Sequence, residues 1–238
     1  MKVLLTNDDG VEAPGLEALY ETVRHALGSQ TQITVVAPHQ CRSECGHSVT
    51  TGRRLNLSQT SRGWYAVDGT PVDCVRVGLG SLVTDAEIVF SGVNAGANLG
   101  VDLMVSGTFA AAREASLHGV AAMAISHYRR PEVPKTWSHV ARWTASTIDD
   151  FINSLNGTVE ENHGKLWNVN LPAIDPETPQ PPIIRCPVDR LPIARTVHAI
   201  GKELEMRADF HSRPHDLGTD VEKCFGGHVT ISELAPHI

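Results

Sequence analysis

Short apolar runs alternate with stretches of helically spaced apolar residues along the first 171 residues of the chain. Such runs are typical of buried strands, and helical spacing of apolar positions is typical of amphipathic helices. Strand–helix alternation builds a parallel sheet with right-handed crossovers, so the predicted fold class is α/β. The pattern predicts strands at 2–6, 33–36, 49–51, 64–67, 88–90, 120–126 and 166–170, the last of the sheet, and helices at 14–27, 71–79, 108–118 and 137–155.

The composition of the chain changes at Pro172: residues 172–192 contain seven of its 14 prolines. Proline lacks a backbone donor, so this density forbids regular helix and weakens strand pairing. After this proline-rich segment, alternating apolar and polar residues predict a hairpin around 199–202. We also expect a short helix followed by a strand within 218–231. We therefore interpret 1–171 as a compact α/β core. Residues 172–238 would form a C-terminal extension with a hairpin and an arm that packs back or reaches a partner subunit.

Composition narrows the class of protein. With 238 residues and 41% hydrophobic residues, the chain can bury a sizeable core. A formal charge of −7 argues against a nucleic-acid-binding surface. The sequence shows neither an apolar run of membrane-spanning length nor an N-terminal signal. It has five cysteines, an odd number, and no C-x-x-C motif. We expect reduced thiols and a cytoplasmic location.

Asp8 and Asp9 follow the first predicted strand, and no basic residue stands among their immediate neighbours. Adjacent carboxylates repel each other, and a bound cation would let both stay ionised. Oxygen ligands suit Mg²⁺ or Mn²⁺, with Ca²⁺ as a further possibility. The position fits a ligand site, because open α/β sheets bind ligands beyond the carboxyl ends of their strands. The alternative is that Asn-Asp-Asp-Gly only forms a tight turn.

Two further loops should emerge at the same edge of the sheet. One carries Ser43, whose hydroxyl could complete a hard-cation shell, and the other begins near Asn94. This second loop is rich in glycine and ends where a helix begins, and a helix N-terminus offers free N–H groups to a phosphate. Its phosphate-binding candidates are Asn98, Ser106, Gly107 and Thr108. The alternative is that Ser106 or Thr108 only caps the helix.

Several segments together resemble the SurE family of stationary-phase survival proteins, which are metal-dependent nucleoside monophosphate phosphatases. They occur in the family's order and span most of residues 1–172. The matching segments are Thr6-Asn7-Asp8-Asp9-Gly10, Ala37-Pro38, Arg42-Ser43, Gly46-His47-Ser48, Gly69-Thr70-Pro71-Val72-Asp73-Cys74, the ten residues from Ser91 to Gly100, Ser106-Gly107-Thr108 and Asn168-Val169-Asn170-Leu171-Pro172.

The resemblance implies a Rossmann-like three-layer core and one divalent metal ion. It also implies a homodimer or homotetramer built by exchanging C-terminal elements. The chain departs from the family at Val105 and Phe109, where tyrosine and valine are expected. The implied metal ligands are Asp8, Asp9, Ser43 and Asn94, and the implied phosphate contacts are Asn98, Ser106, Gly107 and Thr108.

These residues favour hydrolysis of nucleoside 5′- or 3′-monophosphates by a metal-activated water, which Asp8 or Asp9 would orient or deprotonate. Direct attack by Asp9 is a variant of this mechanism. The alternative function is a metal- and nucleotide-binding protein on the same scaffold without turnover. Two other residues are ambiguous in sequence: His47 is either a proton donor or an exposed loop residue, and Asp102 is either structural or part of the site.

Overall fold

A computed structural model describes residues 1–155, 162, 164–192, 196–207 and 210–236 of the chain. The main sheet has nine strands in the order β3-β4-β2-β1-β5-β6-β7-β11-β8. The strands are β1 Lys2–Thr6, β2 Gln32–Pro38, β3 Leu57–Gln59, β4 Tyr65–Val67, β5 Ile88–Asn94, β6 Ala121–His127, β7 Leu166–Leu171, β8 Ile183–Arg185 and β11 Val229–Leu234. The run from β4 to β7 is parallel throughout, which confirms the α/β fold with a mostly parallel sheet.

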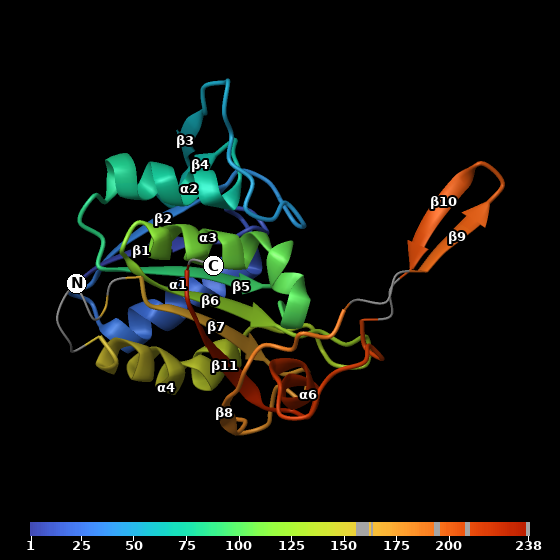
Figure 1. Cartoon of the computed structure of the whole chain (residues 1–238). Helices are drawn as coiled ribbons and strands as arrows, with labels where there is room; N and C mark the ends of the chain where they lie inside the picture. Colours follow the sequence, from blue (N-terminus) through green and yellow to red (C-terminus); the bar gives the residue numbers. More distant parts are fainter. Residues whose placement is uncertain (156–161, 163, 193–195, 208–209, 237–238) are drawn as a thin grey trace.

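Helices cover both faces of the sheet, as Figure 1 shows. The core on one face joins the sheet to α1 and α4, and the core on the other joins it to α2 and α3. Three layers result, and the central strands are buried on both sides. The helices are α1 Pro14–Leu27, α2 Pro71–Val77, α3 Gly107–Leu117, α4 Val140–Asn153 and α6 Asp220–Phe225, with a π-helical turn η1 Gly78–Leu82 and a 3-10 turn η2 Gly100–Met104.

The predicted strand at 49–51 is wrong, because this segment bonds to the start of α2 instead. Thr50 donates its backbone N–H to Asp73 at 2.9 Å, and the Thr70 hydroxyl donates to the Ser48 carbonyl at 2.7 Å. Asp73 and Thr70 also form a capping box at the N-terminus of α2. The edge strand β3 lies later in the chain and is exposed at every position, so no apolar run marked it in the sequence.

The sheet continues beyond β7, contrary to the sequence prediction. The chain returns after α6, and β11 pairs antiparallel to β7 while β8 pairs with β11. The short helix and strand expected at 218–231 are confirmed as α6 and β11. A division of the chain at residue 171 stays a prediction.

The predicted hairpin is confirmed as β9 Thr196–Ile200 and β10 Glu203–Arg207, which pair antiparallel in a sheet of their own. Figure 1 shows this hairpin projecting away from the body of the molecule. All five cysteines are free thiols. None of the described helices has both the length and the apolar run that a membrane crossing requires, and the cytoplasmic location stays a prediction.

Gly15 lets α1 approach the end of β5. A Cβ atom at this position would lie 2.0 Å from the Val93 carbonyl oxygen and 2.8 Å from the Trp137 ring. We expect Gly15→Ala to lower the free energy of unfolding by about 2 kcal/mol through overpacking, although alanine favours helix. Urea denaturation measures the change. Gly80→Ala is the matched control, since nothing lies within 4 Å of its added Cβ; equal stability of the two variants would contradict the prediction.

Candidate active site

The sheet reverses its strand order next to β1, and the predicted site lies at that point. β2 lies on one side of β1 and β5 on the other, all three parallel. Asp8 and Asp9 follow the carboxyl end of β1, and Asn94 is the last residue of β5. Ligands of open α/β sheets bind at such switch points because the loops diverge there and leave a crevice.

A tight turn holds the two carboxylates. The Asn7 side chain donates to the Gly10 carbonyl at 2.8 Å and accepts its N–H at 3.2 Å. Gly10 has a φ of +107°, which favours glycine. The turn interpretation and the ligand-site interpretation are therefore compatible, because Asn7 and Gly10 close the turn and leave Asp8 and Asp9 to other contacts.

Asp8 is buried against the start of α3. The Thr108 hydroxyl donates to Asp8 Oδ1. A Cβ on Gly107 would lie 2.9 Å from the Asp8 Cβ, so glycine permits this close approach. Burial raises the pKa of Asp8 to about 6, the Thr108 hydrogen bond opposes that rise, and the charge of Asp9 adds to it.

Asp9 lies beside the loop that follows β5. Its Oδ2 accepts the backbone N–H of Ala95 at 3.0 Å. Burial raises the pKa of Asp9, and the Ala95 hydrogen bond acts in the opposite direction. Burial therefore disfavours the ionised form of both carboxylates, and a bound cation would favour that form again.

The structure brings most of the predicted residues to one cavity of about 280 Å³. Asp8, Ser43, Asn94, Asn98 and Ser106 line it, together with Glu44, Ala97, Asp102, Val105 and Phe210. Asp9, Gly107 and Thr108 are not among the lining residues. Thr108 is fully buried and supports Asp8 from behind, while Asp9 contacts the β5 loop.

Ser106 acts as the N-cap of α3, since its side chain accepts the Phe109 N–H at 3.0 Å. The capping alternative from the sequence is thus correct for Ser106, yet the residue also lines the cavity. The first N–H groups of α3 have no helical partner, as at any helix N-terminus, and this end of the helix adjoins the cavity. Capping and phosphate binding are compatible here.

Asn98 is fixed by buried polar side chains of the neighbouring strands. Its side-chain amide donates to Ser126 at 2.7 Å, and its backbone N–H donates to Asn170 at 2.9 Å. The Asn98 carbonyl accepts from Asn168 and Asn170 at 3.0 and 2.9 Å. These contacts stiffen the loop between β5 and α3 at the cavity wall.

Phe210 is a lining residue that the sequence did not reveal. It belongs to the C-terminal segment, far from the motifs in the chain, and carries no local signal. Asp102, which was ambiguous in sequence, both lines the cavity and pairs with Arg213 from the same segment. The tail therefore contributes to the wall of the candidate site.

His47 is not a cavity residue among the described positions, because α3 holds it. Arg113 Nε donates to His47 Nδ1 at 3.0 Å, so Nε2 carries the proton and donates to Glu114 at 2.7 Å. Arg76 and His118 also contact Glu114. Burial raises the pKa of Glu114, but these hydrogen bonds outweigh it and lower the pKa to about 2.

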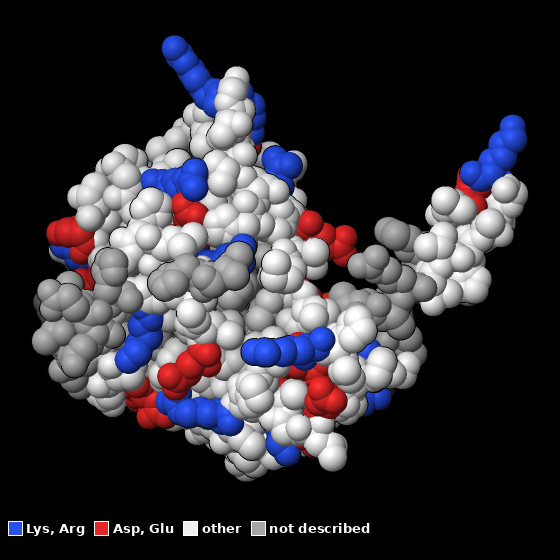
Figure 2. All heavy atoms as spheres, viewed as in Figure 1, with Lys and Arg blue, Asp and Glu red and all other residues white. Residues whose placement is uncertain are grey.

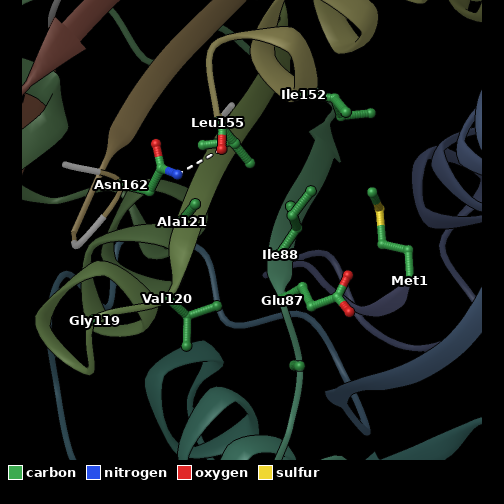
Figure 3. A pocket seen from close by; sticks show the side chains of 10 residues that line it. Met1, Glu87, Ile88, Gly119, Val120, Ala121, Ile152, Leu155 and Asn162 are labelled. Atoms are coloured by element: carbon green, nitrogen blue, oxygen red, sulfur yellow. Dashed lines mark hydrogen bonds between the residues drawn. The ribbon is translucent and has the colours of Figure 1, made fainter. Parts of the chain in front are cut away.

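A larger cavity, of about 470 Å³, lies elsewhere. Met1, Ile88 and Ala121 place it at the amino ends of β1, β5 and β6, opposite the candidate site. Figure 3 shows its lining, where Val120, Ile152 and Leu155 are apolar and Asn162 bonds to the Leu155 carbonyl. It lacks the convergent polar groups of the switch-point cavity.

The donors at the switch point fit a hard cation. Carboxylate, amide and hydroxyl oxygens are available from Asp8, Asp9, Ser43 and Asn94. Asn94 uses its side-chain N–H for the Gly96 carbonyl at 2.9 Å, which leaves its Oδ1 without a partner in the described part of the chain. Only two of the four donors are carboxylates, and no cluster of three His, Cys, Asp or Glu side chains suited to a metal occurs among the described residues. Mg²⁺ tolerates this composition because it keeps several waters.

A mostly parallel sheet with oxygen donors at its switch point is typical of α/β proteins whose small ligands bind at this edge. The model of the family "Survival protein SurE" matches residues 3–189. A putative 5′-nucleotidase of Nostoc sp. is 40% identical over 98% of this chain and 99% of its own. The 5′-nucleotidase SurE of Pelobacter propionicus is 37% identical over 98% and 93%.

This chain superposes on the crystal structure of the SurE protein from Aquifex aeolicus with a TM-score of 0.83 at 28% identity. The match covers 100% of this chain and 94% of that one. The chain belongs to the SurE family. The resemblance inferred from the motifs and the α/β fold are both confirmed.

Glu114 is expected to stabilise the fold, because its buried carboxylate bonds to the more exposed side chains of Arg76, His47 and His118. Its folded pKa lies below the ordinary 4.5, so the stabilisation is complete above that pH and is lost as pH falls toward about 2. We expect Glu114→Gln to lower the free energy of unfolding by about 3 kcal/mol at neutral pH. The difference from wild type should shrink between pH 4.5 and 2.

Denaturant titrations at several pH values measure this difference. Glu17→Gln is the control, because Glu17 forms an exposed pair with Arg62 that contributes less than about 1 kcal/mol. A loss for Glu114→Gln no larger than that of the control would refute the assignment.

Proposed function

We propose that this protein is a divalent-metal-dependent phosphomonoesterase that hydrolyses nucleoside 5′- and 3′-monophosphates to nucleoside and phosphate. The observation that carries the proposal is the cavity that joins Asp8, Ser43 and Asn94 to the start of α3 at Ser106. Cation donors and anion-binding N–H groups meet there, which is the combination that phosphoryl transfer requires. Relatives named 5′-nucleotidase match nearly the whole chain, which supports a nucleotide as the substrate.

Asp8, Asp9, Ser43 and Asn94 would hold the cation, Mg²⁺ or Mn²⁺. When bound, it supplies Lewis acidity and lowers the pKa of water. The chain's own residues supply the remaining chemistry. Asp9 keeps Oδ1 without a partner in the described part of the chain, so it can orient a water or accept its proton.

The phosphate would lie against the start of α3. The N–H groups of the first helical turn and the side chains of Ser106 and Asn98 would stabilise charge on the phosphoryl oxygens. Gly107 keeps this wall close to Asp8, and Thr108 fixes the Asp8 carboxylate. We expect the substrate to be a small molecule, since the formal charge of −7 argues against nucleic acid. On the face drawn in Figure 2, basic and acidic side chains are interspersed.

Phosphate release tests the proposal. Nucleoside monophosphates with Mn²⁺ or Mg²⁺ should yield phosphate, EDTA should abolish the release, and Asp8→Asn should lower kcat/KM at least about a hundred-fold. Asp85→Asn is the matched control, because Asp85 is an exposed carboxylate paired with Lys2. Release that is unchanged in Asp8→Asn would mean that the site is misplaced.

The same experiment addresses the alternative function. Metal and nucleotide binding by calorimetry, without phosphate release from any substrate, would favour a binding protein without turnover. The four cation donors would then serve recognition alone.

The projecting hairpin supports a homodimer or homotetramer as part of the proposal. Val197 and Leu204 are 55% and 74% exposed. They lie on one face of the hairpin, because Leu204 pairs with Ala199, and Val197 is two residues before Ala199 in the same strand. Exposed apolar faces of this kind are typical of interaction surfaces.

Light scattering should give the mass of a dimer or tetramer, and Leu204→Asp should shift the population toward the monomer because it places a charge in the interface. Lys202→Ala, at the exposed hairpin turn, should leave the mass unchanged. A strictly monomeric wild type would contradict exchange of C-terminal elements.

A further inference from the structure

A second cavity, of about 260 Å³, adjoins the loop that carries the candidate cation donors. Pro14, Ala95, Arg129, Lys135 and Trp137 line it, and we call it the Arg129 pocket. Ala95 follows Asn94 directly, and its N–H bonds to Asp9 at 3.0 Å. The Arg129 pocket therefore adjoins the same loop that contributes Asn94 to the candidate active site.

The Arg129 guanidinium has no counterion in the part of the chain that the structure describes. Its Nη1 donates to the Thr136 carbonyl at 3.1 Å, and its Cζ lies 4.2 Å from the centre of the Trp137 ring. Nη2 is buried and has no hydrogen-bond partner. Burial lowers the pKa of Arg129 to about 10, so the side chain stays charged at neutral pH.

The groups around the guanidinium do not neutralise it. His127 and His139 lie nearby, and burial lowers their pKa values to about 3 and about 4, which leaves both rings neutral. Lys135 adds a second cation to the pocket lining. Within the described residues, neither Arg129 nor Lys135 has a carboxylate within ion-pair distance, whereas the adjacent Arg130 pairs with Glu132 at 2.6 Å.

The Thr136 carbonyl and the Trp137 ring stabilise only part of the Arg129 guanidinium, so an anion would add a charge-assisted contact. Arginine offers a planar fork that matches phosphate oxygens, and lysine adds a point charge. The pocket volume far exceeds the roughly 30 Å³ that one water occupies in liquid, so a hydrated phosphate group fits. In a chain of formal charge −7, these two cations make the pocket beside the donor loop locally favourable for an anionic ligand.

We propose that the Arg129 pocket binds the second phosphate of a nucleoside 3′,5′-bisphosphate while the first phosphate occupies the candidate active site. Arg129 and Lys135 would contact this second phosphate, and Trp137 would hold the guanidinium in place. The inference rests on the proposed phosphomonoesterase function, because the two phosphates belong to one substrate.

The test compares KM for an adenosine 3′,5′-bisphosphate with KM for adenosine 5′-monophosphate. In wild type we expect the bisphosphate KM to be about ten-fold lower, as a charge-assisted contact predicts. In Arg129→Gln and in Lys135→Glu, the ratio of the two KM values should approach one. Arg129→Lys should recover part of the preference, because it keeps the charge but loses the fork.

Arg130→Gln is the matched control, since Arg130 is adjacent and exposed but already paired with Glu132. It should keep the wild-type ratio. A wild-type ratio of one, or a ratio unaffected by Arg129→Gln and Lys135→Glu, would overturn the proposal. Lys135 is exposed, so its variant remains informative if Arg129→Gln fails to fold.

Calorimetry separates this inference from the proposed function. If no phosphate is released from either nucleotide, the phosphomonoesterase proposal fails, and the two dissociation constants still test the pocket. A bisphosphate that binds about ten-fold more tightly than the monophosphate, with the difference lost in Lys135→Glu, would support the second phosphate site. Equal affinities would refute it.

Discussion

The hydrogen bond from Thr108 to the buried carboxylate of Asp8 is the contact on which the candidate site depends. Burial and the neighbouring Asp9 charge both disfavour an ionised Asp8, and the Thr108 hydroxyl partly offsets them. The same bond ties the start of α3 to the end of β1, and Gly107 permits the close approach. The candidate cation donors and the N-terminus of α3 are thereby held together by one contact.

Polar contacts from later parts of the chain stiffen the rest of this edge. Asn168 and Asn170 project from β7 and hold the Asn98 carbonyl. Asp220, at the start of α6, accepts the Gly100 N–H at 2.9 Å. Buried amides and carboxylates are stable only when their partners are in place, so the loop between β5 and α3 is fixed by strands and a helix beyond it. The C-terminal segment thus supports the candidate site and also extends the sheet beyond β7.

Two cavities of different charge flank the donor loop after β5. The cavity at Asp8 is acidic and suits a cation, and the Arg129 pocket is basic and suits an anion. Ala95 lines the Arg129 pocket and donates its N–H to Asp9, while its neighbour Asn94 lines the other cavity. Within the proposed function, one phosphate of a bisphosphate would enter the Asp8 cavity only together with the bound cation, while the Arg129 pocket would take the other phosphate directly. The charge pattern around the loop is then a basis for substrate selection.

The sequence determined the central sheet and the approximate place of the site. Apolar runs marked β1 and β5, and parallel strands necessarily bring the residues at their carboxyl ends, Asp8 and Asn94, to one edge. Tertiary structure alone decided which side chains face the cavity. Thr108 donates to Asp8, Phe210 comes from the C-terminal segment, and Arg129 Nη2 finds no hydrogen-bond partner among the described residues. Local patterns fix strands and helices because these depend on near neighbours, whereas orientation and pairing depend on residues distant in the chain.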